Sequence, residues 1–404
     1  MQLSQFDVTT AFLYADLEED IYMEQPPGYG DGSERVCKLK KSLYGLKQSP
    51  RQWNQRFTNF LVKHKLKAID ADNCVFVNTD KNLYLAIYVD DGLIAAEKEE
   101  DMKNMIRELQ KEFKITIGSL TCYLGMEIQR LKNGSIFISQ KRYAEKVLQK
   151  FQMLEANPVS IPMEPNINLS EEVQPAVKNL YSNTPYREAI GSLRYLATAT
   201  RPDISYALNK VSQYMERPME HHWNAVKRIF KYLKGTQEYG ILYKKDGGEL
   251  HGYSDSDFAG DTDSRRSTTG YVFLNAGGAI TWGSRKQQVV ALSTMEAEYI
   301  AGCSATQEAT WLQLLFKELT GKKNSIPLYI DNASALKYIE NPEFHKRTKH
   351  IDTKYHFIRE KQKDGTIETQ KIDGKLNLAD MFTKALPKER FQEQTSGIGV
   401  QKEK

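Results

Sequence analysis

Two adjacent carboxylates interrupt an apolar stretch of this 404-residue sequence. Residues 85–89 and 93–95 are apolar or aromatic, and Asp90, Asp91 and Gly92 lie between them. Packing two carboxylates together costs free energy unless a cation neutralises them, and hard oxygen ligands suit Mg²⁺ or Mn²⁺. A solvated polar turn without a ligand is the alternative. The residue types therefore indicate either a divalent metal site or an ordinary turn.

A third carboxylate could join this pair. Asp7 follows the short apolar segment that begins the chain, where it could cap the next turn. If Asp7 and Asp90 end neighbouring strands at one sheet edge, with Asp91 beside them, they form a two-metal site. Such a site activates a 3′-hydroxyl and stabilises a leaving pyrophosphate.

Acidic residues also recur at element ends in the C-terminal half. Asp255 and Asp257 end a predicted strand, and Glu296 and Glu298 lie on a predicted helix over 295–319. Asp331 ends another predicted strand, and Asp380 lies in a short predicted helix. Each is commonplace alone. Together, such carboxylates could hold divalent metal ions.

The elements that position these residues follow from hydrophobic periodicity. Apolar residues flanking Asp-Gly predict a β-hairpin over 85–95, with the positive φ of its turn at Asp91-Gly92. Helical spacing predicts helices over 101–113, 187–197 and 219–234, and strands are expected at 250–257, 270–274, 279–282 and 328–331. His221 and His222 have no further ligand at metal spacing and are expected on the surface.

Composition limits the class of protein. The chain is 40% hydrophobic and 27% charged, and it contains neither an apolar run of membrane-spanning length nor a signal-peptide pattern. Its four cysteines form no Cys-x-x-Cys pair, which favours a reduced intracellular compartment and argues against zinc. Because the formal charge is only +4, nucleic-acid binding has to come from local patches. Residues 36–53, where basic and aromatic side chains alternate, form such a patch.

Several motifs occur together in a recognisable order. Tyr88-Val89-Asp90-Asp91 looks like the polymerase motif of reverse transcriptases, and Tyr44-Gly45-Leu46-Lys47-Gln48-Ser49-Pro50 and residues 22–28 closely resemble copia-type (Pseudoviridae) LTR-retrotransposon Pol polyproteins. The later order of strand Asp, helix Glu, strand Asp and helix Asp resembles RNase H. The resemblance implies an α/β (α+β) fold. It consists of an incomplete right-hand reverse transcriptase, with palm, partial fingers and helical thumb, followed by an RNase H-like α/β domain.

The resemblance also implies roles for individual residues. The catalytic and metal-binding set is Asp7, Asp90, Asp91, Asp255, Glu298, Asp331 and Asp380. Glu298 is preferred to Glu296, and Asp255 to Asp257, because their sequence context matches the family better. Phe12 corresponds to an aromatic gate against the sugar 2′-hydroxyl, although it could be a core residue. The other substrate-binding residues are Tyr44, Gly45, Lys47, Gln48, Tyr88, and, in the hairpin that resembles the primer grip, Tyr123 and Gly125.

The predicted domains are palm and partial fingers over 1–132, a helical thumb or connection over 133–247, an RNase H-like domain over 248–390 that folds alone, and a disordered tail over 391–404. The histidine-rich segment His345–Glu360 is expected to contact a hybrid or pack on the sheet. Only six residues precede Asp7, so the fingers that hold the triphosphate are expected to be missing, as in a truncated polyprotein.

The implied function is an RNA-directed DNA polymerase with ribonuclease H activity, dependent on Mg²⁺ or Mn²⁺. Its partners would be an RNA template, a DNA primer, RNA–DNA hybrid, deoxynucleoside triphosphates and other Pol or Gag products, with no membrane. The expected location is cytoplasmic, in a virus-like particle, or nuclear. A catalytically inactive remnant that at most binds nucleic acid is the alternative.

Overall fold

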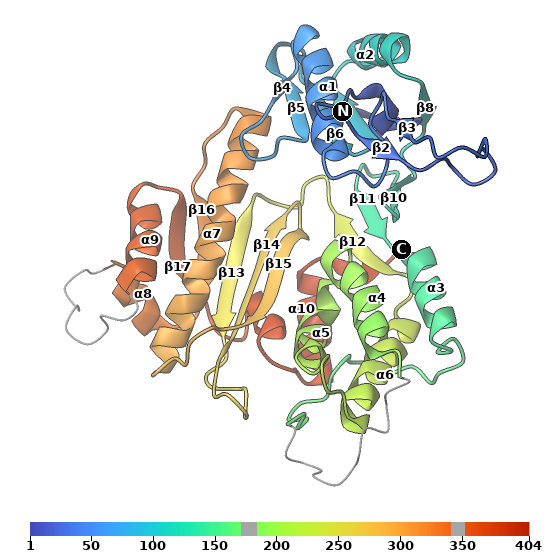
Figure 1. Cartoon of the computed structure of the whole chain (residues 1–404). Coiled ribbons are helices and arrows are strands. Elements are labelled where there is room, and N and C mark those ends of the chain that lie inside the picture. Colours follow the sequence, from blue (N-terminus) through green and yellow to red (C-terminus); the bar gives the residue numbers. More distant parts are fainter. Residues whose placement is uncertain (171–183, 341–351, 404) are drawn as a thin grey trace. The chain divides into compact units, whose positions relative to one another are not determined.

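The computed structural model describes residues 1–170, 184–340 and 352–403. The chain divides into two compact units, Met1–Leu124 with Leu314–Lys322 and Gly125–Gln313 with Lys323–Lys404. Figure 1 labels their elements. Within the described ranges, no helix has the length and apolar character needed to cross a membrane. The sequence placed boundaries near 132 and 247, whereas the structure divides the chain after Leu124 and keeps both later segments, apart from Leu314–Lys322, in one unit.

The first unit contains a six-stranded sheet in the order β4-β5-β6-β7-β1-β8. All its pairings are antiparallel. The elements of this unit before α7 are β1 (Gln2–Val8), η1 (Ala11–Tyr14), β2 (Tyr22–Met23), β3 (Cys37–Lys38), α1 (Ser49–Lys63), β4 (Lys67–Ala68), β5 (Val75–Asn78), η2 (Thr79–Lys81), β6 (Leu83–Tyr88), β7 (Asp91–Ala96), α2 (Glu99–Glu112), β8 (Ile115–Gly118) and β9 (Cys122–Tyr123).

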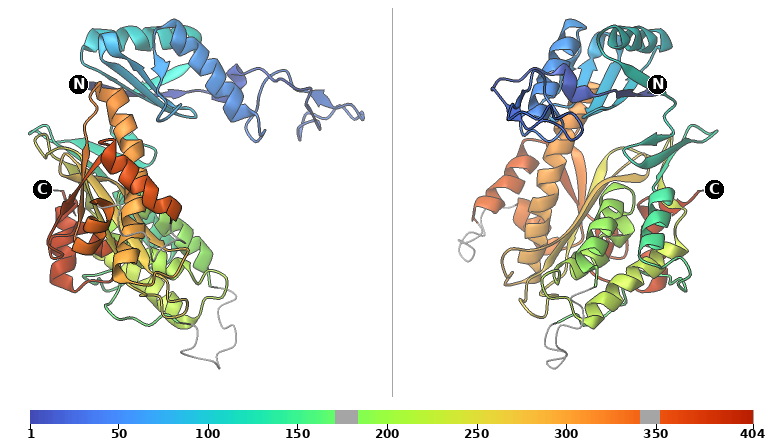
Figure 2. Two further views of the ribbon diagram at one scale, coloured as in Figure 1. Left: turned by 90° about the vertical axis from the view of Figure 1, so that its left-hand side faces the viewer. Right: turned by 45° about the vertical axis from the view of Figure 1, so that its right-hand side comes forward.

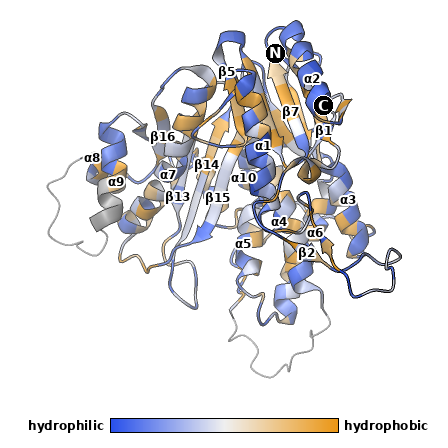
Figure 3. Cartoon of the chain, turned by 45° about the horizontal axis from the view of Figure 1, so that its top comes forward, coloured by the Kyte–Doolittle hydropathy of each residue, from blue (hydrophilic) through white to orange (hydrophobic). Residues whose placement is uncertain are grey.

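The apolar stripes of α1 and α2 pack with the sheet. Figure 3 shows strand β7 coloured largely as hydrophobic, whereas much of α2 is hydrophilic. Met102, Met105 and Leu109 of α2 are buried at helical spacing, and Phe57 of α1 and Phe113 belong to the same core cluster. This confirms the amphipathic helix expected at 101–113. The core holds the strand ends that carry Asp7, Asp90 and Asp91.

The second unit begins with helices and a small antiparallel sheet. Its strands run in the order β18-β12-β11-β10. These elements are β10 (Met126–Arg130), β11 (Ile136–Ser139), α3 (Lys141–Lys150), α4 (Tyr186–Ala199), η4 (Pro202–Ile204), α5 (Ser205–Ser212), α6 (Glu220–Gly235) and β12 (Tyr239–Tyr243).

A five-stranded mixed sheet in the order β15-β14-β13-β16-β17 completes this unit. β13, β14 and β15 are antiparallel, whereas β16 and β17 run parallel to β13. Figure 2 shows α7 lying along this sheet. The elements are β13 (His251–Ser256), β14 (Thr268–Asn275), β15 (Gly278–Lys286), α7 (Thr294–Thr320), β16 (Ile326–Ile330), α8 (Ala333–Glu340), α9 (Asp352–Lys363), β17 (Ile367–Lys371), η6 (Leu378–Phe382), α10 (Lys388–Gly397) and β18 (Val400–Lys402).

One hydrophobic cluster joins the helical segment to the mixed sheet. It includes Leu193 of α4, Val211 of α5 and Phe230 of α6 together with Val272 of β14. The Trp282 indole also donates a hydrogen bond of 2.8 Å to the Ala197 carbonyl. The turn at Gly247-Gly248 therefore does not separate two cores, although the sequence suggested a domain boundary there.

The predicted disordered tail is wrong. Residues 388–397 form α10, and β18 pairs with β12 from Ile241↔Val400 to Tyr239↔Lys402. Phe391, Ile398 and Val400 are buried in the shared cluster. These are the only three large apolar residues between positions 391 and 404, too few for hydrophobic periodicity to predict an ordered segment.

Part of one predicted motif lies outside the described residues. Of the segment His345–Glu360, residues 345–351 are not described, and residues 352–360 lie in α9.

Candidate functional sites

The hairpin of the first unit turns at Val89 and Asp90. Tyr88 pairs with Asp91, which leaves a two-residue loop, and the positive φ of 58° is at Val89. The sequence predicted the positive φ at Asp91-Gly92 instead. Gly92 instead lies within β7, where a Cβ would be 2.1 Å from the Phe6 ring, so glycine is needed here for close packing. A β-branched residue at positive φ is strained, and such strain persists where surrounding contacts hold it.

Two hydrogen bonds hold this turn. The Trp53 indole donates to the Val89 carbonyl at 2.6 Å, and the Val8 backbone N–H donates to the Asp90 carbonyl at 2.8 Å. Trp53 lies in α1, so the basic segment before this helix is connected to the hairpin through a buried side chain.

The first-unit carboxylates gather at this turn. Asp7 pairs with Asp91 across β1 and β7. Burial and the charges of Asp90 and Asp7 raise the pKa of Asp91 above its usual value. The Tyr44 hydroxyl donates to the Asp90 carboxylate at 3.0 Å. The fold therefore brings Asp7 and Asp90 close enough to Asp91 for their charges to act on its carboxylate.

Tyr44 also connects Asp90 to Phe12. The two rings lie 4.3 Å apart between centroids, and Phe12 is 6% exposed within the core cluster. Burial, the hydrogen bond to Asp90 and the charges of Asp90 and Asp7 raise the pKa of the Tyr44 hydroxyl. Phe12 is thus a core residue by burial. Among the described residues its ring contacts that of Tyr44, and the Tyr44 hydroxyl in turn donates to Asp90.

Of the other predicted substrate residues of the first unit, Tyr88 and Tyr123 lie at this turn. Lys47 is exposed, and Tyr88 is 63% exposed. Gln48 precedes α1 and accepts a hydrogen bond from the Glu18 backbone at 3.4 Å. The Tyr123 hydroxyl donates to the Asp91 carbonyl at 3.4 Å. Two glycines, Gly45 with φ 98° and, in the second unit, Gly125 with φ 73°, adopt left-handed backbone conformations.

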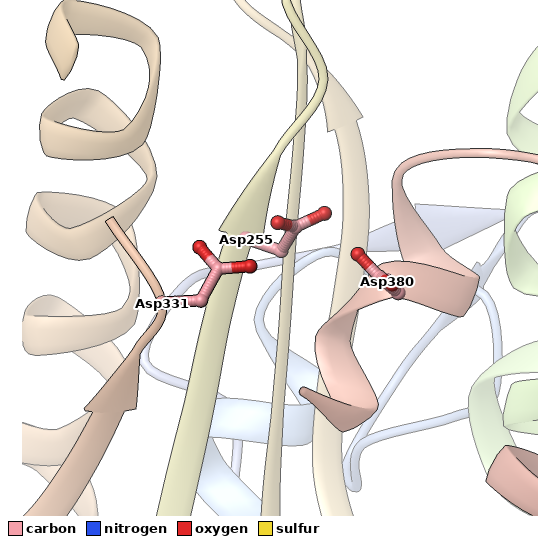
Figure 4. Close-up of side chains that lie close together, drawn as sticks. All are labelled: Asp255, Asp331 and Asp380. Atoms are coloured by element: carbon pink, nitrogen blue, oxygen red, sulfur yellow. The ribbon is translucent and has the colours of Figure 1, made fainter. Parts of the chain in front are cut away.

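The second unit places three aspartates together. Asp255 ends β13, Asp331 follows β16 and Asp380 lies in η6. Because β13 and β16 are parallel neighbours, their carboxyl ends meet at one edge of the sheet. In the described part of the chain, this is the one group of three metal-ligating side chains whose ligand atoms lie within 4.8 Å of one another. Figure 4 shows their carboxylates directed toward one another.

Glu298 supplies a fourth carboxylate from α7. It is 6% exposed, and the charges of Asp255 and Asp331 act on it. Its Oε2 atom is buried without a hydrogen-bond partner in the described structure. Glu296 instead accepts a hydrogen bond of 2.9 Å from the Leu292 backbone at the start of α7. The spacing from Ser293 to Glu296 is that of a capping box, in which the glutamate binds the backbone at the start of the helix. This spacing identifies Glu296, rather than Glu298, as the capping glutamate from the sequence.

Asp257 has a different environment from Asp255. Its carboxylate accepts a hydrogen bond from the Thr268 backbone N–H, while its own N–H donates to the Thr268 carbonyl at 3.2 Å. Asp257 thus closes the connection between β13 and β14 and is absent from the aspartate group. Burial raises its pKa to about 6.

Burial, followed by charge repulsion, raises the pKa values of the carboxylates at the second site. Burial and the Asp380 charge raise the pKa of Asp255 to about 7. Burial, followed by the charges of Asp255 and Asp331, raises the pKa of Glu298 to about 10. Burial and Asp380 also raise the pKa of Asp331. Buried carboxylates that destabilise one another in this way are ordinarily matched by a cation.

Three residues that the sequence did not predict contact these carboxylates. The Thr383 hydroxyl donates to Asp255, Lys384 forms an ion pair of 2.6 Å with Asp380 Oδ1, and Arg390 pairs with Asp380 Oδ2. Although burial opposes it, the charges of Asp255 and Asp380 raise the pKa of Lys384. Lys384 lies four residues after Asp380, a spacing that predicts a helical ion pair. Arg390 gave no such signal because it borders the segment predicted to be disordered.

The chain is similar to known reverse transcriptases and transposon proteins. The family described as "Reverse transcriptase (RNA-dependent DNA polymerase)" matches residues 1–165. A retrovirus-related Pol polyprotein from transposon TNT 1-94 of Nicotiana tabacum is 41% identical over 402 residues, covering 97% of this chain and 30% of that protein. A putative transposon Ty5-1 protein of Saccharomyces cerevisiae is 31% identical over 309 residues, covering 75% of this chain and 99% of that protein.

A solved structure has the same fold. The foamy viral protease-reverse transcriptase in complex with RNA/DNA hybrid aligns with 92% of this chain and 44% of that chain, with a TM-score of 0.51 and 12% identity. The fold class is therefore that of a reverse transcriptase followed by an RNase H-like domain, as the sequence predicted. The chain belongs to the reverse transcriptase family of copia-type retrotransposon Pol polyproteins. It spans about 30% of the tobacco relative's length.

Proposed function

We propose that this chain is an RNA-directed DNA polymerase with ribonuclease H activity. The second unit would cleave the RNA strand of an RNA–DNA hybrid, and the first would extend a DNA primer on an RNA template with deoxynucleoside triphosphates. The observation that carries the nuclease assignment is the group Asp255, Asp331 and Asp380, whose ligand atoms lie within 4.8 Å of one another beside buried Glu298. Membership of the reverse transcriptase family and the hybrid in the foamy viral complex support both activities.

The second site fits divalent metal ions. Its donors are carboxylate oxygens, which suit Mg²⁺ or Mn²⁺, and Glu298 Oε2 is buried without a partner. We assign the metal to Asp255, Glu298, Asp331 and Asp380. When bound, a divalent ion would neutralise the carboxylates, polarise the scissile phosphate and lower the pKa of a water nucleophile.

The chain's own residues prepare this site in three ways. The sheet edge fixes Asp255 and Asp331, because both follow paired parallel strands. The Thr383 hydroxyl orients the Asp255 carboxylate by donating to it. Lys384 places a positive charge on Asp380, where it partly offsets the repulsion among the aspartates. Preorganised charges of this kind need no reorganisation during the reaction.

The first site would hold Mg²⁺ or Mn²⁺ through Asp7, Asp90 and Asp91. Burial and the charges of Asp90 and Asp7 raise the pKa of Asp91, and the Tyr44 hydroxyl restrains Asp90. Phe12 beneath the Tyr44 ring would limit space at the sugar 2′ position. The proposed partners are template, primer and hybrid, with other Pol or Gag products in an intracellular particle, in the cytoplasm or the nucleus.

Two assays on the same purified chain test these assignments. Primer extension on an RNA template with Mg²⁺ reports the first site, and cleavage of a labelled RNA–DNA hybrid reports the second. We expect hybrid cleavage that EDTA abolishes. If hybrid binding occurs with neither extension nor cleavage in Mg²⁺ or Mn²⁺, the chain is an inactive nucleic-acid-binding remnant and the enzymatic proposal is wrong.

A further inference from the structure

The C-terminal segment 388–403 is anchored in the second unit. Phe391 is 5% exposed and its ring makes an edge contact with Tyr232 of α6 at 5.7 Å between centroids. Ile398 and Val400 are also buried, and β18 extends the small sheet through β12. Helix α10 is therefore fixed at its apolar face and at its C-terminal end.

The same helix holds the turn that carries Asp380. Gln394, which is 3% exposed, accepts a hydrogen bond of 3.1 Å from the Met381 backbone and donates one of 3.0 Å to the Asn377 carbonyl. These two bonds lie on either side of Asp380 in the sequence. A single buried amide side chain thus fixes the backbone of η6 relative to α10.

Arg390 holds the side chain of the same aspartate. Its Nη2 atom pairs with Asp380 Oδ2 and donates to the Gly374 carbonyl at 2.7 Å. Asp380 is 1% exposed, so its carboxylate depends on protein groups for its orientation. The guanidinium is planar and its donors have fixed directions, so anchoring it at Gly374 restricts the positions that Asp380 Oδ2 can take.

The second cation on Asp380 differs from Arg390. Lys384 pairs with Oδ1, but its side chain is 46% exposed and its ammonium group sits on a flexible four-carbon stem. A bound metal ion can displace this lysine without disturbing the fold. Arg390 lies on the anchored helix and pairs with Asp380 Oδ2. It can therefore keep this contact when a metal ion replaces Lys384 at Asp380 Oδ1.

We propose that Arg390 is a positioning residue of the nuclease site, and that α10 fixes Asp380 toward Asp255 and Asp331. The inference rests on the proposed ribonuclease function. Two opposite effects of Arg390 on metal binding are physically possible, because its charge repels a cation while its hydrogen bonds orient a ligand. The geometry points to orientation as the larger effect, since the guanidinium contacts the carboxylate oxygen opposite to the one that Lys384 covers.

Substitutions in the full-length chain separate these effects. Arg390→Gln removes the ion pair, Arg390→Lys keeps the charge without the planar fork, and Lys388→Gln removes one charge from an exposed position of the same helix. Each is made with Asp90→Asn, so that Mn²⁺ titration by calorimetry reports mainly the second site. Melting temperatures are measured for every variant.

We expect Arg390→Gln to weaken Mn²⁺ binding roughly 10-fold, the size typical of groups that orient metal ligands. Hybrid cleavage should show a lower kcat with KM for the hybrid unchanged, Arg390→Lys should recover part of both losses, and Lys388→Gln should match the parent. Unchanged or tighter Mn²⁺ binding in Arg390→Gln would overturn the proposal.

The outcome also separates this proposal from the proposed function. If the parent chain binds Mn²⁺ without cleaving the hybrid, the ribonuclease assignment fails, and a 10-fold loss of affinity in Arg390→Gln still supports positioning. If the parent cleaves and Arg390→Gln binds and cleaves equally well, only positioning fails. If Arg390→Gln does not fold, Arg390→Lys decides, because full Mn²⁺ affinity and kcat in that variant show that the planar guanidinium is not required.

Discussion

Replacing Asp255 with asparagine should stabilise the metal-free chain at neutral and alkaline pH. Burial and Asp380 raise the pKa of Asp255 from 3.8 to about 7. Between these pH values the unfolded chain releases a proton that the folded chain retains, so the free energy of unfolding falls as pH rises. Asparagine has almost the same shape, can still accept from Thr383 and does not ionise.

The magnitude follows from the two pKa values. Above pH 7 the difference between 3.8 and about 7 corresponds to about 4 kcal/mol, at about 1.4 kcal/mol per pH unit. This is an upper limit because neighbouring carboxylates share the repulsion. In a unit of this size it would raise the melting temperature by on the order of 10 °C. The difference should shrink as the pH falls and become small near pH 4, where the unfolded aspartate is close to half protonated.

Scanning fluorimetry in EDTA between pH 4 and 8 measures this effect. Hydrogen exchange of β13 and η6 identifies the transition of the second unit, because a chain of two units need not unfold in one step. Asp246→Asn, at an exposed position, is the matched control and should not change the melting temperature. If Asp255→Asn melts below the parent at pH 8 in EDTA, carboxylate repulsion does not govern this site.

Four further predictions follow from the two sites and the shared core. Asp331→Asn should lose hybrid cleavage, keep its fold and gain less melting temperature from Mg²⁺ than the parent; cleavage at the parental rate would remove Asp331 from the site. Asp90→Asn should abolish primer extension while leaving hybrid cleavage largely intact, and unchanged extension would contradict the polymerase assignment. Phe12→Ala should admit ribonucleotides if the ring is a sugar gate, whereas lower thermal stability with unchanged sugar selectivity would identify a core residue only. A fragment of residues 248–390 should melt far below the full chain or aggregate, because it exposes the cluster shared with α4, α5 and α6; a fragment as stable as the full chain would contradict this.

The fragment prediction reverses what the sequence suggested. The glycine pair at 247–248 is a turn signal, and the order of acidic residues after it is complete. Neither feature reports where apolar surface is buried. Trp282 and Val272 pack against helices that precede them by many residues, a contact that only the folded chain reveals.

Buried polar groups provide a second case. His222 was expected on the surface, yet it is fully buried in α6. Its Nδ1 atom accepts from the Met219 backbone at 2.9 Å, and Nε2 lies 2.8 Å from the Leu169 carbonyl. A local sequence cannot show that a distant carbonyl will satisfy a histidine nitrogen, and without that partner burial would be too costly.

By itself the sequence determined the family, the order of the elements and the carboxylates. Strands and amphipathic helices are local patterns, and several long motifs occurred together in one order. The tertiary structure decided which acidic residues meet. It separated Glu298 from Glu296 and Asp255 from Asp257 by hydrogen bonds, and it brought Arg390 to Asp380. The meeting of Asp255, Asp331 and Asp380 depends on contacts between segments distant in the chain, which packing rather than local propensity determines. The hydrogen bonds and the ion pair join residues only four to eleven positions apart, but they involve polar side chains, so hydrophobic periodicity does not report them.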